Sequence, residues 1–376
     1  MSAQLIDKLL ETFPEKGIPG CDLAVAVDGK EVYRKQTGFS NAEKTRPVSE
    51  EDMYWVFSIS KTITCAAALK LVEEGRLGLD DPVYKYLPEY KDLKVKVKDG
   101  DPIPAKNVMT VRQLFTMTSG LNYNIASPSL LKARENSNAT TREIVAAIVE
   151  TPLDYEPGTR YNYSLSHDVL GAVIEVITGM SLSEYLDKLL FTPLGMNDTT
   201  FHPTDEQLSR LSQMYVYDRV AECAVLRENK NEYKLSDKFE SGGAGICTTV
   251  NDYMKFASCL ACGGKAPDGT AIFKPETVAM MQVDQLDATT KKSFFDARLF
   301  GYSWGLCGRV HTNPVVSMSK TPAGEFGWDG AAGALALIDP KNQIAVYFAM
   351  EVRGCTYAYN RLHAHIINTV YKALGF

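Results

Sequence analysis

The sequence lacks the features that mark several large classes of protein. It contains no run of about eighteen apolar residues, so a membrane-spanning helix is not expected. Its first residues, Met1 to Leu10, show no basic segment followed by an apolar one, which predicts a chain that is not exported and stays in the cytoplasm. The formal net charge is only -6 over 376 residues, without blocks of like charge. This balance argues against a nucleic-acid groove and leaves a small molecule as the expected partner.

Cysteine and histidine are too sparse to indicate a disulfide framework or a metal centre. Eight cysteines in a chain of 376 residues fit reduced thiols in a cytoplasm. The single C-x-x-C pair, Cys259 and Cys262, has no second pair that would complete a zinc site. His363 and His365 stand two apart on a predicted helix and therefore face different directions. We expect neither a metal nor a cofactor.

The residues that are present predict a folded protein with two lobes. Hydrophobic residues make up 45% of the chain and charged residues 23%, as in ordinary globular proteins. The length exceeds what one hydrophobic core usually organises, so we expect two lobes that meet at a crevice. A turn-rich stretch after Asp81-Pro82 indicates the exit from the first lobe. The predicted division is a sheet lobe built from 1–82 and 238–376, and a mainly helical lobe over 83–237.

Local patterns predict antiparallel strands at both ends of the chain and helices between them. Asp28-Gly29 tolerates the positive φ angles of a tight hairpin and joins the strand-like segments 21–27 and 31–38. This hairpin argues against a parallel, doubly wound sheet. Further strands are expected near 300–310, 332–338 and 344–350, with helices over about 252–260 and 357–374 and with capping boxes at Thr140/Glu143 and Ser181/Glu184.

The strongest chemical signal is a serine and a lysine three residues apart, Ser58 and Lys61. This spacing places both side chains on one face of a helix, and the apolar pattern from Ser58 to Gly75 is helical. A serine hydroxyl needs a base, and a neutral lysine serves if its pKa falls from about 10.4 toward 7. Backbone N–H groups at a helix start also favour negative charge on the serine oxygen. We predict Ser58 as nucleophile and Lys61 as its base.

Other serines match simple motifs equally well and must be excluded by context. Ser129 with Lys132 and Ser317 with Lys320 have the same spacing, but neither opens a long helix with an apolar face.

Ser303 lies in a G-x-S-x-G motif, followed by Asp339 and His363 in the chain order of α/β-hydrolases. A nucleophile elbow requires a preceding strand and a following helix, whereas 306–316 is predicted as further strand. The parallel βαβ units of that fold are also missing upstream. We therefore prefer Ser58.

Five segments in order resemble the class C β-lactamase superfamily, which includes family VIII carboxylesterases and D-aminopeptidases. They are Trp55 to Thr62, Gly75 to Pro82, Leu114 to Leu121, Pro157 to Ser164, and Gly243 to Ile246 ahead of Asp252-Tyr253. The resemblance covers most of the chain. It implies the α/β (α+β) fold of serine β-lactamases and DD-peptidases, an antiparallel sheet flanked by helices beside a helical lobe.

The resemblance also implies roles for further residues. Tyr163, in the second motif, would carry protons between nucleophile, leaving group and water. The segment Phe326 to Ala331 looks like the third motif, in which Gly330 lets the backbone approach the substrate. The N–H groups of Ala331 and Ser58 would then form the oxyanion hole.

Three positions depart from the lactamase and peptidase pattern. Leu165 replaces the asparagine that helps to hold an acyl amide, and Trp328 with Asp329 replaces the cation and hydroxyl that hold a carboxylate. An acidic side chain at that place would repel a penicillin or a peptide C-terminus. These changes favour a neutral ester or a cationic substrate over a β-lactam.

The sequence therefore predicts a serine hydrolase that forms an acyl-enzyme on Ser58, a carboxylesterase of small neutral esters. Four alternatives stay open: a β-lactamase, a D-amino-acid peptidase, an acyltransferase, and a relative that binds a ligand without catalysis. The expected partner is a small ester or amide substrate. The oligomeric state is not indicated.

Overall fold

The computed structural model describes residues 2–294 and 299–376. Its largest element is a seven-stranded sheet in the order β2-β1-β13-β12-β11-β10-β9, in which every neighbouring pair is antiparallel. The antiparallel sheet expected from the sequence is confirmed. Its strands are β1 (Gly20–Val27), β2 (Lys30–Gly38), β9 (Tyr302–Gly305), β10 (Gly308–His311), β11 (Phe326–Asp329), β12 (Leu335–Asp339) and β13 (Ile344–Ala349).

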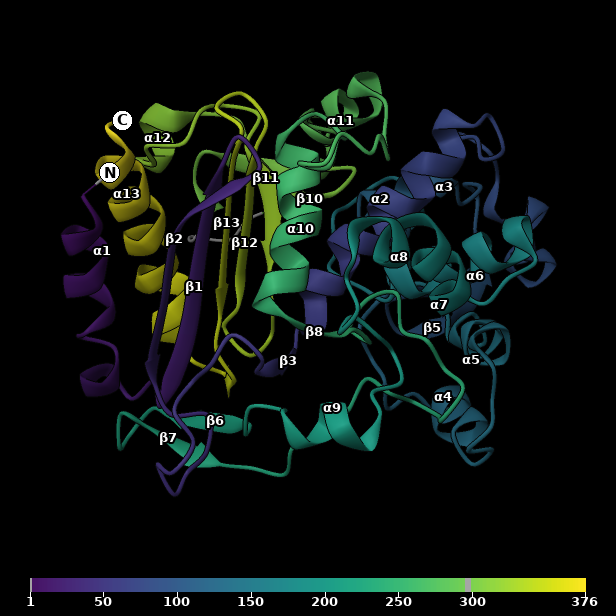
Figure 1. Cartoon of the computed structure of the whole chain (residues 1–376). Coiled ribbons are helices and arrows are strands. Elements are labelled where there is room, and N and C mark those ends of the chain that lie inside the picture. The colour runs from purple at the N-terminus through teal and green to yellow at the C-terminus, as the bar shows by residue number, and fades with distance from the viewer. Residues whose placement is uncertain (1, 295–298) are drawn as a thin grey trace.

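The β1–β2 hairpin forms for the reason that the sequence suggested. Asp28 and Gly29 both have positive φ, 52° and 73°, which matches the right-handed twist of the two strands. β1 then pairs with β13, so strands from both ends of the chain lie side by side (Figure 1). The chain ends also meet, because the amide of Ser2 donates to the carbonyl of Ala373 at 3.0 Å.

Each face of this sheet is covered by helices because its strands alternate in side-chain direction. Leu23 and Val25 pack into one core with α1 (Ala3–Leu10) and α13 (His363–Leu374). Ala24 and Ala26 face the opposite core, where α10 (Val250–Ala261) lies (Figure 1). Small alanines on this side let α10 approach closely.

The remaining helices gather mainly beyond the β9 side of the sheet (Figure 1). Both predicted capping boxes are confirmed, at the starts of α5 and α7. The division into lobes at 82/83 and 237/238 stays a prediction. The helices are α2 (Ser60–Glu73), α3 (Val111–Phe115), α4 (Pro128–Ala133), α5 (Thr141–Ile148), α6 (Ser166–Thr178), α7 (Leu182–Leu186), α8 (Thr192–Leu194), α9 (Asp205–Ser209), α11 (Pro275–Met281) and α12 (Pro314–Ser317).

Three small sheets complete the fold. The pair β3–β8 matters most, because β3 leads directly into the segment that carries Ser58. The strands are β3 (Met53–Trp55) with β8 (Cys247–Thr249), β4 (Lys94–Val97) with β5 (Gly100–Pro104), and β14 (Val352–Arg353) with β6 (Tyr215–Asp218) and β7 (Cys223–Leu226).

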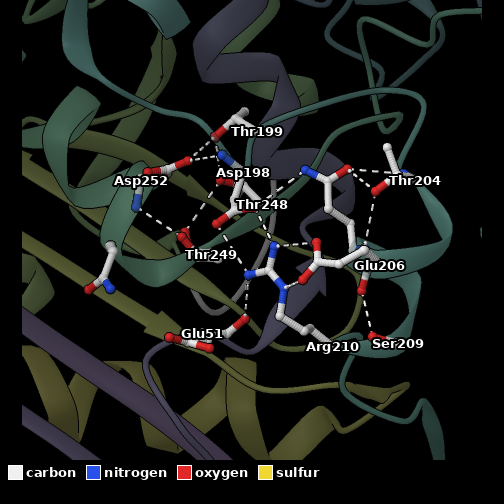
Figure 2. A network of polar contacts seen from close by, with 12 residues as sticks. Glu51, Asp198, Thr199, Thr204, Glu206, Ser209, Arg210, Thr248, Thr249 and Asp252 are labelled. Carbon is white, nitrogen blue, oxygen red and sulfur yellow. Dashed lines mark hydrogen bonds and ion pairs between the residues drawn. The ribbon is translucent and has the colours of Figure 1, made fainter.

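A network of polar contacts fastens the segment after α8 to β3, β8 and α10 (Figure 2). Arg210 binds the carboxylates of Asp198 and Glu206 and donates to the carbonyl of Glu51 at 3.0 Å. Asp252 in turn accepts from the amide of Asp198 at 2.7 Å. The network therefore holds the start of β3 in place through several charge-assisted hydrogen bonds.

Among the described residues, no single helix has both the length and the apolar character needed to cross a membrane. In the part of the chain that the structure describes, one bent pair, α6 with Leu182–Leu194, reaches that length and apolar character, but the two parts meet at an angle of 75°.

Candidate active site

Ser58 sits in a single 3₁₀ turn, Phe57–Ile59, immediately before α2. Phe57 is fully buried and has a φ of 46°, a left-handed conformation that costs a phenylalanine on the order of 1 kcal/mol or more. The surrounding core enforces this bend, and Ser58 faces a cavity. The predicted helix thus begins two residues after Ser58, but the serine keeps its place at the helix start.

Lys61 lies one turn further along and reaches back to the serine. Its Nζ is 3.2 Å from Ser58 Oγ, 3.2 Å from the hydroxyl oxygen of Tyr123 and 2.7 Å from the carbonyl oxygen of Gly243. The side chain is 1% exposed. The predicted serine–lysine contact is therefore present in the structure.

Burial makes Lys61 a weaker base than an exposed lysine. Desolvation lowers the pKa of its ammonium to about 8, while the charge of Asp168 acts in the opposite direction. An amine with this pKa is partly neutral at physiological pH. It can accept a proton from a neighbouring hydroxyl.

Tyr163 stands beside the serine–lysine pair. Its hydroxyl oxygen accepts a hydrogen bond from the indole Nε1 of Trp328 at 2.9 Å, and Lys61 Nζ lies 4.7 Å from its ring centroid. Burial raises the pKa of the phenol, and hydrogen bonds from Ser58 and Trp328 only partly offset this. Tyr163 therefore stays protonated at neutral pH and can donate as well as accept.

Tyr123 is a site residue that the sequence reasoning missed. Its ring stacks on that of Tyr163, with centroids 5.4 Å apart, and Lys61 Nζ lies 5.1 Å from its centroid. Two aromatic faces therefore stabilise a cation at Lys61. The only sequence signal was its position shortly after the segment Leu114 to Leu121.

The candidate oxyanion hole lies in the turn after β11. The amide of Gly330 bonds the carbonyl of Ala334 and that of Gly333 bonds the carbonyl of Gly330, both at 2.9 Å. Within the described parts of the chain, the amides of Ala331 and Ser58 have no acceptor. A Cβ at Gly330 would lie 2.7 Å from the carbonyl oxygen of Val56. Glycine therefore lets this turn approach the backbone next to Ser58.

These groups open into a cavity of about 610 Å³. Half of the described residues that line it are aromatic, and none of them is lysine or arginine. The lining residues are Ser58, Tyr123, Tyr161, Asn162, Tyr163, Tyr233, Ser293, Phe294, Leu299, Trp328, Asp329, Gly330, Ala331 and Tyr359. Most of the predicted site residues thus meet in this lining. Lys61 is buried behind it and contacts Ser58, and Leu165 is buried outside it.

Asp329 is held by Arg309 and His363 behind the cavity wall. Its Oδ1 lies 3.2 Å from Arg309 Nη1 and 3.5 Å from His363 Nδ1. Arg353 pairs with Glu232. The guanidinium of Arg309 is itself buried and also pairs with Glu325, at 3.1 Å.

The rival nucleophiles have other surroundings. Ser303 lies within β9 and donates to Asp284 Oδ1 at 2.6 Å, so the strand–turn–helix of a nucleophile elbow is absent there. The predicted strand over 306–316 is only partly correct, because α12 occupies its end.

Ser317 bonds His311 Nε2 at 2.7 Å and ends that short helix, so it does not open a long helix, as the sequence indicated. Within residues 2–294 and 299–376, no three His, Cys, Asp or Glu side chains lie close enough together to bind a metal ion.

The fold and this constellation define a serine hydrolase. The sequence model of the Beta-lactamase family matches residues 3–355, and the chain belongs to that family.

Known relatives share much of the chain. Protein Rv1367c of Mycobacterium tuberculosis is 29% identical over 330 residues, 84% of this chain and 81% of the relative. Esterase EstB of Burkholderia gladioli is 28% identical over 364 residues, 90% of this chain and 87% of the relative. The solved structure of EstCE1, described as a hydrolase with promiscuous acyltransferase activity, has a TM-score of 0.82 at 24% identity and covers 98% of both chains.

Proposed function

We propose that this protein is a carboxylesterase that forms an acyl-enzyme on Ser58 with small neutral esters. The observation that carries the proposal is the contact between a buried lysine of lowered pKa and a serine that faces an aromatic cavity. A neutral substrate fits because the described lining offers no cation for a carboxylate. The likeness to Esterase EstB supports the same reaction class.

The hydrogen bonds of Lys61 determine where the lone pair of its neutral amine points. A neutral amine has two N–H donors and one lone pair. The Gly243 carbonyl can only accept, so one N–H points to it; if the second serves Tyr123, the lone pair faces Ser58 Oγ. In this arrangement Lys61 is oriented to receive the serine proton.

Acylation then proceeds by nucleophilic attack, proton transfer and loss of the alcohol. Ser58 Oγ attacks the ester carbonyl carbon while its proton passes to Lys61, and the carbonyl oxygen becomes an oxyanion held by the amides of Ser58 and Ala331. Collapse breaks the bond to the alkoxy group, which takes a proton through Tyr163. Water, deprotonated by the same groups, releases the acid in the second half-reaction.

The test is intact-mass analysis of the protein mixed with a p-nitrophenyl acyl ester while nitrophenol release is followed. Wild type and Ser303→Ala should gain the acyl mass and turn over, whereas Ser58→Ala should do neither. Labelling that survives in Ser58→Ala would overturn the proposal. Repetition with a penicillin tests the lactamase alternative, for which we expect no rapid turnover. Addition of a primary alcohol tests acyl transfer.

A further inference from the structure

A buried carboxylate lies close to the proposed base, and the mechanism above does not use it. Asp168 stands in the first turn of α6 and is 1% exposed. Its Oδ1 accepts from Ser241 Oγ at 2.5 Å and from the amide of Gly243 at 3.2 Å. Its Oδ2 has no hydrogen-bond partner in the described chain. A half-satisfied buried carboxylate is costly and calls for a compensating cation.

Asp168 and Lys61 hold the same glycine from two sides. The carboxylate binds the N–H of Gly243, and Lys61 Nζ binds its carbonyl oxygen at 2.7 Å. A Cβ at Gly243 would lie 2.7 Å from Asp168 Oδ2, so only glycine lets the carboxylate approach. The neighbouring carbonyl of Gly242 is fixed to Thr64 of α2 at 2.8 Å. The turn therefore transmits the position of Asp168 to Lys61.

The other titratable groups that the described residues place beside Lys61 keep their charge state around pH 8. Burial lowers the pKa of His167 to about 3, so this imidazole is neutral. Burial raises the pKa of Cys65 on α2, and of Tyr123 and Tyr163 across the cavity, so these groups are neutral as well. Among the described residues, no carboxylate forms a direct ion pair with Lys61. Asp168 is the carboxylate whose charge acts on it, at longer range but with little screening by water.

We propose that Asp168 is a positioning residue for acylation: it supplies the counter-charge for the Lys61 ammonium and holds Gly243 against it. The inference rests on the proposed role of Lys61. When the proton of Ser58 moves to Lys61, a cation forms in a buried place. The Asp168 carboxylate stabilises that cation, while the oxyanion carries the negative charge on the substrate.

The proposal predicts two separate effects when the negative charge of Asp168 is removed, one on the pKa of Lys61 and one on the limiting rate. In Asp168→Asn the ammonium loses its attraction, so the pKa of Lys61 falls and the neutral base appears at lower pH. The limiting rate at high pH falls, because proton transfer now creates an unsupported cation. A merely structural role would lower the rate without moving the pH dependence.

The experiment is the pH profile of kcat/KM for wild type and Asp168→Asn with a p-nitrophenyl ester. We expect the acid limb to move down by about one pH unit and the plateau to drop about tenfold. Asp339→Asn is the matched control, since Asp339 is also a buried, hydrogen-bonded carboxylate but lies at the end of β12. Its acid limb should stay where it is. An unmoved limb in Asp168→Asn overturns the proposal.

A second measurement keeps the test valid if Asp168→Asn does not fold. In Lys61→Met the cation is absent, so the folded-state pKa of Asp168 should rise further above its unfolded value of about 3.9. A group with a raised folded pKa stabilises below its unfolded pKa, and this contribution is lost as pH rises through the folded pKa. Lys61→Met should therefore lose stability toward neutral pH more steeply than wild type in urea unfolding. Equal pH dependence of the two proteins would overturn the proposal.

Failure of the proposed function gives a different result. If the mass analysis shows no acyl group on Ser58 of wild type, the proposed function and the role of Lys61 as base are both refuted. The pH profile of kcat/KM then no longer reports on Lys61. If Ser58 is labelled and only the limb of Asp168→Asn is unmoved, the esterase proposal stands and the role of Asp168 falls.

Discussion

Two basic residues near β3, Lys61 and Arg210, have opposite electrostatic surroundings. Arg210 is paired with the carboxylates of Asp198 and Glu206, and these contacts raise the pKa of its guanidinium (Figure 2). Lys61 has hydroxyl and carbonyl neighbours, and burial lowers the pKa of its ammonium to about 8. A cation with matched anions stays charged and ties chain segments together. A buried cation without direct anions gives up its proton, which is what a base requires.

The largest change should come from removing Lys61, which has no directly paired carboxylate among the described residues. Lys61→Ala should lower kcat/KM by about a thousandfold while the protein still folds, because the serine loses its base. Lys70→Ala is the matched control on the same helix, where the amine binds Glu73 and the carbonyl of Ile272. Ester hydrolysis by both variants, with circular dichroism as the check on folding, measures the difference. Near-normal turnover in Lys61→Ala would refute its role.

The pH dependence of the wild type sharpens the comparison next. Lys61 must be neutral to act, so kcat/KM should rise with pH and level off above its pKa of about 8. At pH 6 the rate should be about a hundredfold below the plateau, since each pH unit below the pKa removes about nine-tenths of the neutral base. Initial rates between pH 5.5 and 10, corrected for spontaneous hydrolysis, test this. A flat profile would show that the base is another group.

Tyr123→Phe should have a smaller effect. The variant keeps the stacked ring but removes the hydroxyl that lies 3.2 Å from Lys61 Nζ. We expect kcat to fall about tenfold with little change in KM, because the lone pair of Lys61 is less well oriented. Tyr90→Phe, which removes a buried hydroxyl bonded to the carbonyl of Val145, is the control. Equal losses in both variants would mean that only packing was disturbed.

Arg210→Ala should affect catalysis least. The change removes the matched cation and should lower the free energy of unfolding by roughly 1–2 kcal/mol, because its carboxylate partners are partly solvated. The value of kcat/KM should stay within about twofold of wild type. Urea unfolding followed by tryptophan fluorescence, with rates measured on the same samples, tests both statements. A tenfold loss of rate would mean that the two regions are coupled.

Local signals allowed much of the fold to be predicted. The hairpin at Asp28-Gly29, the capping boxes at Thr140 and Ser181, and the Ser58–Lys61 contact depend on residues close in sequence. Such features follow from turn and helix geometry alone.

The rest of the site depends on tertiary contacts that no local pattern encodes. Tyr123 meets Lys61 across 62 positions, and Gly243 meets it across 182. The pairing of Asp329 with Arg309 needed the register of β10 against β11. Nothing in the spacing of these residues distinguishes them from other tyrosines, glycines and arginines.

The pairing of β1 with β13 has a consequence during synthesis. Residues 20–27 leave the ribosome long before their partners at 344–349. Until then one edge of the first hairpin exposes unpaired N–H and C=O groups to other nascent chains. Pairing across so long a separation is slow, which makes this hairpin a natural target for chaperones that shield strand edges. The sheet can thus close only after residues 344–349 have been synthesised.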